Sequence, residues 1–166
     1  MHNFFPNHDV EEAVEVYRSF QTKTYKELVQ MFPGMRELVL ELKEKGYKLA
    51  IVTSRLRPTT MDGLEKFGLV ETFDYVTTAD DTDKHKPDPE PAMIALNRLG
   101  STPQEAILVG DTMFDMGCGK NAGMKTVIVG WAMATDAQAE INEYTPDYRI
   151  KKAEDLWDVL AELDAE

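Results

Sequence analysis

The sequence is poor in the features that mark disulfide-stapled, nucleic-acid-binding or membrane-spanning proteins. Its 166 residues include one cysteine, Cys118, which excludes an internal disulfide and is compatible with a reducing cytoplasm. Lysine and arginine number 18 against 30 acidic residues, and the net charge of −12 argues against a nucleic-acid partner. No apolar run approaches the length of a membrane span, and the first residues lack the pattern of a signal peptide. We therefore expect a cytoplasmic protein with no nucleic-acid or membrane partner.

The hydrophobic fraction of 43% is sufficient for one compact core, with a small appendage at most. Before residue 32, apolar residues recur at helical spacing in two short stretches. Pro33 and Gly34 then interrupt the chain. This interruption predicts a helical N-terminal piece over 1–31 and a main body over 32–166.

In the main body, strand-like and helix-like segments alternate. Strands are predicted near 47–53, 73–77, 106–109, 126–129 and 148–150, and helices near 35–45, 59–67, 89–99, 114–122, 136–144 and from 154 onward. Such alternation produces right-handed β-α-β units and a parallel sheet covered by helices on both faces. The predicted fold class is therefore α/β, with three layers arranged α/β/α.

Two candidate metal ligands follow one of the predicted strands. In an open parallel sheet, ligands bind beyond the carboxyl ends of the strands, where Asp111 stands directly after an apolar run and Gly110. Asp115 comes about one helical turn later, so both carboxylates can face one point. Mg²⁺ usually takes one or two carboxylates, with waters and substrate phosphate. We predict that Asp111 is a direct Mg²⁺ ligand and Asp115 a ligand or the holder of a bound water; the alternative is a turn residue followed by an exposed helix residue.

Candidate phosphate-binding groups lie at the end of an earlier strand and in a charged loop. Thr53 ends the apolar run at Ile51-Val52 and offers a hydroxyl, while Ser54 offers a backbone amide. Lys86 precedes Pro87, which keeps it out of a helix interior, and its charge would offset the acidic rim. Taken separately, a Thr-Ser pair is most often a helix-cap turn, and Lys86 could be a solvated loop residue.

Together these motifs resemble the haloacid dehalogenase superfamily of phosphatases, in its phosphoglycolate phosphatase and pyrophosphatase-like branch. The similarity is carried in order by Ile51-Val52-Thr53, by Lys86-Pro87-Asp88-Pro89 and by Gly110-Asp111-Thr112 with Asp115, and further by Phe32-Pro33-Gly34-Met35 and by 120–126. The resemblance implies Mg²⁺-dependent hydrolysis of a small phosphate ester or pyrophosphate. It also implies catalytic roles for Thr53, Lys86 and Asp111, and identifies residues 1–31 as part of a helical cap.

One family motif has no counterpart in this chain. The family carries its aspartate nucleophile in an Asp-x-Asp-x-Thr motif on an opening strand, and no such motif precedes Thr53. Asp9 does not follow a strand-like run, and Asp81-Thr82-Asp83 lies in a charged loop downstream. The resemblance therefore implies a sheet without its first strand, as a late start, a split gene or a fragment would produce. In the family that strand lies between the one ending at Thr53 and the one ending at Val109.

The missing strand leaves three outcomes open for the sheet and three for the activity. The gap is expected to close by direct pairing of its neighbours, by a strand from another copy in a homo-oligomer, or by a separate N-terminal segment. The chain is a phosphatase or pyrophosphatase, an inactive phosphate-binding remnant or subunit, or a phosphomutase of the same superfamily. The specific substrate is not readable, because about half of the cap that selects it is absent.

Overall fold

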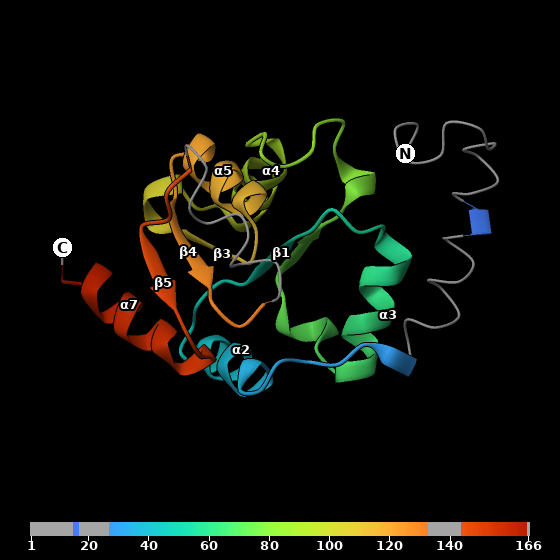
Figure 1. The fold of residues 1–166 in the computed structure, drawn as a ribbon, viewed down its shortest axis with the longest axis horizontal. Coiled ribbons are helices and arrows are strands. Elements are labelled where there is room, and N and C mark those ends of the chain that lie inside the picture. The colour runs from blue at the N-terminus through green and yellow to red at the C-terminus, as the bar shows by residue number, and fades with distance from the viewer. Residues whose placement is uncertain (1–14, 17–26, 133–143, 166) are drawn as a thin grey trace.

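The computed structural model describes residues 15–16, 27–132 and 144–165, drawn in colour in Figure 1. The helices and strands in chain order are α2 (Met35–Glu44), β1 (Ala50–Val52), α3 (Arg57–Phe67), β2 (Tyr75–Thr77), α4 (Glu90–Leu99), β3 (Ile107–Gly110), α5 (Met113–Ala122), β4 (Lys125–Val129), β5 (Tyr148–Ile150) and α7 (Leu156–Leu163). Short 3₁₀ turns at Val70–Thr72, Ala79–Asp81, Pro103–Glu105 and Ala153–Asp155 connect several of them.

All strand pairs in the described part of the chain are parallel, and they form two separate sheets. β1 pairs only with β2, with Ile51 opposite Val76. The second sheet has the order β3-β4-β5, with Val109 opposite Val127 and Ile128 opposite Arg149. Helices lie on both sides of these strands in Figure 1, with α4 and α5 on one side and α2 and α7 on the other. This is the predicted α/β/α arrangement.

Alternate residues of β4 contribute to two apolar cores, because successive strand side chains point to opposite faces. Val127 and Val129 pack with residues of α2 and α7, including Leu38 and Leu156. Ile128 packs on the other face with residues of α4 and α5. The two cores fix the second sheet between its helix layers and thereby fix the position of the β3–α5 connection.

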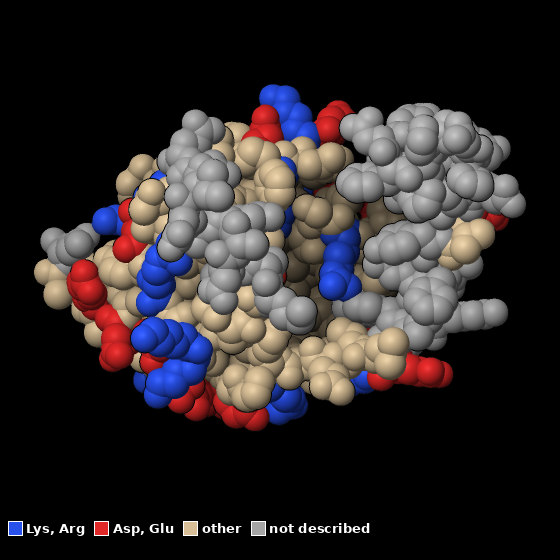
Figure 2. All heavy atoms as spheres, viewed as in Figure 1, with Lys and Arg blue, Asp and Glu red and all other residues tan. Residues whose placement is uncertain are grey.

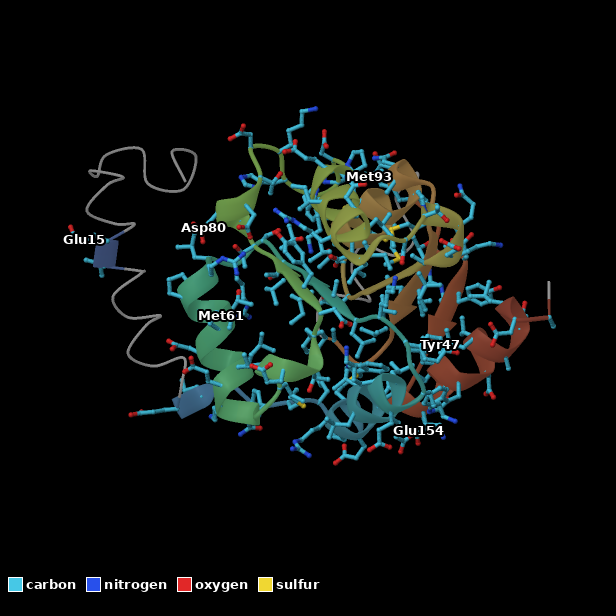
Figure 3. The ribbon with its side chains drawn as sticks, turned by 180° about the vertical axis from the view of Figure 1, so that it is seen from behind. Glu15, Tyr47, Met61, Asp80, Met93 and Glu154 are labelled. Carbon is cyan, nitrogen blue, oxygen red and sulfur yellow. The ribbon has the colours of Figure 1, made fainter. Side chains whose placement is uncertain are left out.

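The start of helix α3 is fixed by its own first residues and by the loop that follows β2. Leu56 precedes it in an extended conformation, and Pro58 occupies one of its first two positions. The amide of Arg57 donates to Asp80 Oδ2 at 2.6 Å, which satisfies a donor at the start of the helix. Figure 3 shows Asp80 beside this end of α3, and Met61 farther along the helix. The β1–α3 connection is thus tied to the loop that follows β2.

Most predicted elements are present. The helix at 35–45 is α2, the strand at 148–150 is β5, and the helix at 114–122 is α5, which begins one residue earlier. The first predicted strand, 47–53, is limited to Ala50–Val52. The amide of Leu49, just before β1, donates to Asp74 Oδ2 at 2.8 Å rather than to a neighbouring strand. The helix predicted at 136–144 falls almost entirely outside the described residues, as does much of the helical N-terminal piece predicted over 1–31.

The sheet gap expected from the missing motif is present between β1 and β3. Within the described residues these strands belong to different sheets and do not pair. Direct pairing, one of the three predicted ways of closing the gap, is therefore wrong for this chain. Helix α4 contacts β1 and β2 of the first sheet and also α5, so it packs against elements on both sides of the gap.

Candidate active site

Lys86 joins the two sheets at the carboxyl ends of their strands. Its ammonium group donates to the carbonyl oxygen of Val52, the last residue of β1, at 3.2 Å. It also donates to Asp115 Oδ1, in the first turn of α5, at 2.5 Å. The contact places the ends of β1 and β3 at a common rim, because α5 directly follows β3. Lys86 is therefore a largely covered bridge with an exposed side-chain fraction of 12%, and its interpretation as a solvated loop lysine is wrong.

Asp115 is fixed from two directions. Thr112 is the residue before α5, and its hydroxyl and amide donate to Asp115 Oδ2 at 2.7 and 3.0 Å. The amide of Asp115 donates back to the Thr112 hydroxyl at 3.3 Å, which completes a reciprocal helix cap. Asp115 retains only 6% of its exposure, so these donors and Lys86 supply the hydrogen bonds that water would otherwise give its carboxylate. The alternative of an exposed helix residue is wrong.

Gly110 is required by the proximity of Asp115. A Cβ atom built on Gly110 would lie 2.5 Å from Asp115 Cγ and 2.8 Å from its Oδ2, much closer than such atoms approach. The close approach of strand and helix backbone at this turn therefore depends on the absence of a side chain. The sequence analysis named Gly110 only as the residue before Asp111, and the structure shows that it makes room for the Asp115 carboxylate.

The donor arrangement around Asp115 occurs at two other aspartates. In each case the hydroxyl and amide of one threonine donate to a single carboxylate oxygen, and a Lys or Arg contacts the same carboxylate. The three sets are Thr112–Asp115–Lys86, Thr78–Asp81–Arg57 and Thr126–Asp147–Lys120. Burial on its own raises the pKa of Asp81 and of Asp147, but these donors outweigh it and hold both pKa values below the ordinary range. We infer that the arrangement favours the ionised form of Asp81 and Asp147, and that in all three sets it holds the carboxylate in place.

Unlike Asp115, Asp111 has a carboxylate that is available to bind a ligand. It is exposed, and its carboxylate forms no hydrogen bond or ion pair with any described residue. Within the described ranges, no group of three or more His, Cys, Asp or Glu side chains could hold a metal ion. Mg²⁺ is usually bound by one or two protein carboxylates together with waters and phosphate oxygens, so one free carboxylate is the smallest number that suits it. The residues present thus fit a metal through Asp111, while both oxygens of Asp115 are occupied.

Thr53 and Ser54 lie next to the Lys86 bridge. The amide of Thr53 donates to Thr77 at 3.0 Å, and its hydroxyl accepts from the amide of Arg55 at 3.2 Å. The hydroxyl proton of Thr53 is therefore left for another acceptor. The Ser54 amide donates to no described residue, and the residue is exposed. The structure brings Lys86 and Asp115 into contact and places Thr53 and Ser54 directly after Val52. Asp111 forms no hydrogen bond or ion pair with any of these four residues.

The sequence analysis missed two contributors to this site. Thr112 anchors Asp115, and the Thr-x-x-Asp spacing of a helix cap could have identified it. Asn121 donates to the carbonyl of Pro87 at 3.0 Å and so holds the loop that carries Lys86. No local pattern marks Asn121, because its partner lies 34 residues away.

The described part of the face displayed in Figure 2 is of mixed charge. Figure 2 shows basic and acidic side chains interspersed on the face it displays, outside the grey residues. Arg57, near the rim, is already bonded to Asp81 at 2.6 Å and to the Val76 carbonyl at 3.0 Å. Attraction of an anion therefore depends on a few placed donors rather than on a broad positive field. None of the described helices is long and apolar enough to cross a membrane.

Comparisons with known proteins agree with the resemblance. The profile of the family described as "Haloacid dehalogenase-like hydrolase" matches residues 1–129, including the stretch before Phe32. The pyrophosphatase PpaX of Halalkalibacterium halodurans is 42% identical over 151 residues, which cover 91% of this chain and 69% of that protein.

Two solved structures share the fold. A HAD phosphatase from Thermococcus onnurineus has a TM-score of 0.73 and 30% identity, covering 87% of this chain and 64% of that one. A putative beta-phosphoglucomutase from Thermotoga maritima has a TM-score of 0.78 and 26% identity, covering 94% and 71%. The chain thus spans about two thirds of the length of these relatives. It belongs to the haloacid dehalogenase-like hydrolase family.

Proposed function

We propose that this chain carries the metal- and phosphate-binding half of a Mg²⁺-dependent phosphatase site, acting on pyrophosphate or a small phosphate ester. The observation that carries the proposal is the Lys86 bridge. A lysine ammonium has three N–H donors, and two of them are used by Val52 and Asp115. The third is left for a phosphate oxygen at the rim. The similarity to PpaX pyrophosphatases supports pyrophosphate as the first substrate to test.

The other rim groups have complementary roles in this proposal. The Thr53 hydroxyl and the Ser54 amide donate to phosphate oxygens, since neither proton is used by a described residue. Asp111 holds Mg²⁺, which when bound neutralises phosphate charge. Asp115 positions Lys86 and can hold water, but its two oxygens are already engaged. Such fixed donors stabilise charge that develops on phosphate without having to reorganise.

Hydrolysis through an aspartyl-phosphate needs a nucleophile, and the described rim residues, with Asp111 assigned to the metal, do not provide one. We propose that a complementing segment or a second copy supplies it, and that the chain alone binds phosphate without turning it over. The bacterial PpaX relatives and the single cysteine support a cytoplasmic location. A phosphomutase is the second candidate, favoured by the Thermotoga maritima neighbour, and would use the same rim residues.

Titration calorimetry with Mg²⁺ and pyrophosphate tests the proposal on the chain alone. We expect Lys86→Met to weaken pyrophosphate binding by about tenfold or more, since a charge-assisted hydrogen bond contributes about 1.5–3 kcal/mol. Lys84→Met is the matched control, because Lys84 lies in the same loop with a 66% exposed side chain and pairs with Asp88. Equal affinities in wild type and Lys86→Met, or no pyrophosphate binding at all, would contradict the proposal.

Turnover separates the candidate activities. When the part of PpaX that this chain does not match is added as a separate polypeptide, a phosphatase releases inorganic phosphate from pyrophosphate or an ester. A phosphomutase instead moves phosphate between positions of a sugar, which NMR of the product detects. Release by the isolated chain at the rate of an intact relative would sink the claim that it lacks its nucleophile.

A further inference from the structure

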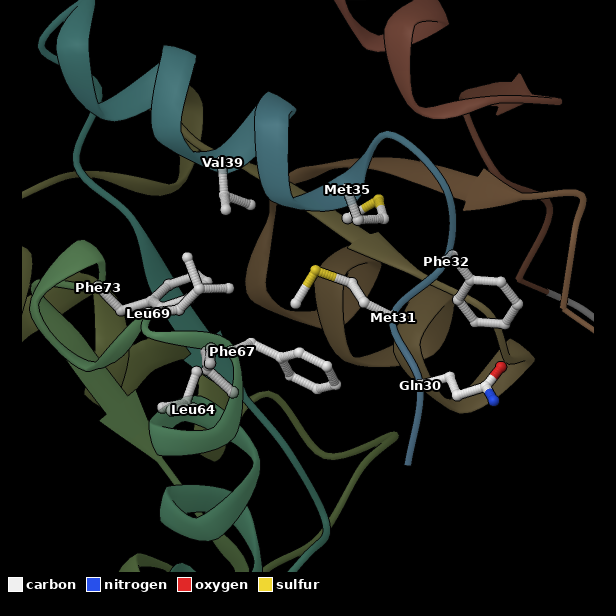
Figure 4. Close-up of a pocket in the computed structure, with 10 residues that line it drawn as sticks. Gln30, Met31, Phe32, Met35, Val39, Leu64, Phe67, Leu69 and Phe73 are labelled. Atoms are coloured by element: carbon white, nitrogen blue, oxygen red, sulfur yellow. The ribbon is translucent and has the colours of Figure 1, made fainter. Parts of the chain in front are cut away.

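Between α2 and α3 lies a cavity to which the proposed phosphate site gives no role. Its volume is about 280 Å³, which is about twice the roughly 150 Å³ of an apolar cavity that holds benzene. Nine of its ten described lining residues are apolar, and the tenth, Gln30, is exposed and therefore lies at its open side. Figure 4 shows the lining residues around the cavity, with Met31 directed into it. A cavity of this size and lining suits an uncharged apolar group of several carbon atoms.

One wall of the cavity is held in place without a ligand. Lys66 of α3 donates to the carbonyl oxygen of Val29 at 2.9 Å and to that of Glu27 at 3.5 Å. These bonds fix the segment that continues into residues 30–32, which form this wall. A preformed wall binds a ligand without the entropic cost of ordering it first. Two of the lining residues are methionines, whose flexible side chains adapt to the shape of an apolar group.

The cavity reaches the strand that carries the proposed phosphate donors, because Ile51 of β1 lines it. The amide of Thr53 donates to the carbonyl of Thr77 at 3.0 Å, so the pairing with β2 continues through Thr53. Residues two apart on a strand point to the same face, so the Thr53 side chain lies on the face that borders the cavity. The rise of about 3.3 Å per residue puts Thr53 roughly 7 Å nearer the rim than Ile51. One ligand can therefore place a phosphate at Thr53 and an apolar group in the cavity.

The same face is open to solvent on β3. Ile107 packs against the core that α2 and α7 form, and Val109, two residues later, points to the same side of the strand. Val109 is 39% exposed although it precedes the last residue of β3. The α2 side of the strands is therefore accessible just below the rim, where a ligand would enter.

On this basis we propose that the substrate class of the rim site is a phosphate monoester with an uncharged aliphatic tail, which occupies the cavity between α2 and α3. The inference rests on the proposed function, because Thr53, Ser54 and Lys86 must hold the phosphate. Each methylene that enters the cavity should raise the affinity by about three- to fourfold, since it leaves water for an apolar surface. A second phosphate gains nothing there, because none of the described lining residues is charged. The site should therefore bind such an ester more tightly than pyrophosphate.

Calorimetric titration of the isolated chain with Mg²⁺ and a series of alkyl phosphates tests the inference by binding alone. The series runs from inorganic phosphate through methyl and butyl phosphate to hexyl phosphate. We expect similar affinities for inorganic and methyl phosphate, which stay at the rim. Hexyl phosphate should bind about tenfold more tightly or better, because at least two of its methylenes reach the cavity. Affinities that do not rise with the length of the tail overturn the proposal.

A substitution that fills the cavity shows where the tail binds. Val39 lines the cavity, so Val39→Phe places a larger side chain in it and should abolish the gain in affinity of hexyl over methyl phosphate. Leu40→Phe is the matched control, because Leu40 is the next residue of α2, is also half-buried and is not among the described residues that line the cavity. It should keep the gain. Equal effects of the two substitutions contradict the proposal.

Methyl NMR of the wild-type chain tests the same site without any substitution. Hexyl phosphate, but not inorganic phosphate, should shift the methyl signals of Ile51 and Val39, while those of Leu108 in the core beside α4 and α5 serve as the control. Unchanged signals of Ile51 and Val39 overturn the proposal. Inorganic phosphate that binds at the rim with no gain from a tail refutes this inference alone. A chain that does not bind inorganic phosphate refutes the proposed function, and with it the substrate class.

Discussion

Removing the carboxylate of Asp115 should destabilise the chain far more than removing an equally close carboxylate elsewhere. Asp115→Ala leaves the Lys86 ammonium without its partner at a site where both side chains are about nine-tenths buried, with 12% and 9% exposure. Breaking a fully buried pair costs about 3–5 kcal/mol. Lys86 keeps its bond to Val52 and some access to water, which lowers this cost to about 2–3 kcal/mol, and loss of the cap at Thr112 adds about 1 kcal/mol.

Asp74→Ala is the matched control. Asp74 also accepts from a lysine at 2.5 Å and from a backbone amide at 2.8 Å, but its pair with Lys43 has side-chain exposures of 34% and 37%. An exposed pair contributes about 0–1 kcal/mol, and the amide bond about 1 kcal/mol. The two substitutions therefore differ mainly in burial, and we expect Asp115→Ala to cost about 2 kcal/mol more.

Urea unfolding followed by circular dichroism measures the difference. With a slope of about 2 kcal/mol per M, the midpoint of Asp115→Ala should fall about 1 M below that of Asp74→Ala. The double variant Lys86→Met/Asp115→Leu should recover much of the loss, because it removes the stranded charge. Equal midpoints for the two alanine variants, or a double variant less stable than Asp115→Ala, would refute the reasoning from burial.

Three further predictions use other described contacts. Gly110→Ala should displace Asp115 and lower the free energy of unfolding by about 1–3 kcal/mol, as its Cβ would lie 2.5 Å from Asp115 Cγ; an unchanged urea midpoint would refute this. The pKa of Asp147 is lowered in the folded chain, so its ionised carboxylate stabilises the fold above its unfolded pKa, and this stability is lost as pH falls through its folded pKa. Asp147→Asn should therefore lower the free energy of unfolding at pH 7 but not in acid below the folded pKa. Urea titrations of both chains at the two pH values measure this difference. Burial raises the pKa of the Cys118 thiol, and the residue is 0% exposed. A thiol reagent should therefore label Cys118 only when the chain unfolds, and rapid labelling of the folded chain would contradict its buried position.

The alternation of apolar runs with helix signals was sufficient to predict the layers and the rim. An apolar run before Gly110 predicts a strand end there, and the parallel-sheet rule then places Thr53 and Asp111 at the same edge. Asp115 was predicted to face that edge, but not to be occupied by Thr112 and Lys86. The cap at Thr112 is a local pattern that could have been found.

The sequence could not predict contacts that involve backbone atoms or loops far apart in the chain. The Val52 carbonyl is invisible in a residue pattern, yet its bond to Lys86 is what ties the two sheets together. The bond from the Leu49 amide to Asp74, just before β1, joins residues that lie 25 positions apart. Periodicity places each strand in the sequence but does not say how α4 packs against β1 and α5 around the gap between the two sheets.

An amide chemical-shift titration of the isolated chain with inorganic phosphate and Mg²⁺ tests the phosphate site most directly. The account predicts that the largest shifts occur at Thr53, Ser54 and Asp111, and that Lys86→Met suppresses them while Lys84→Met does not. Shifts confined to other parts of the chain, or identical shifts in the Lys86 variant, would contradict a phosphate site at this rim.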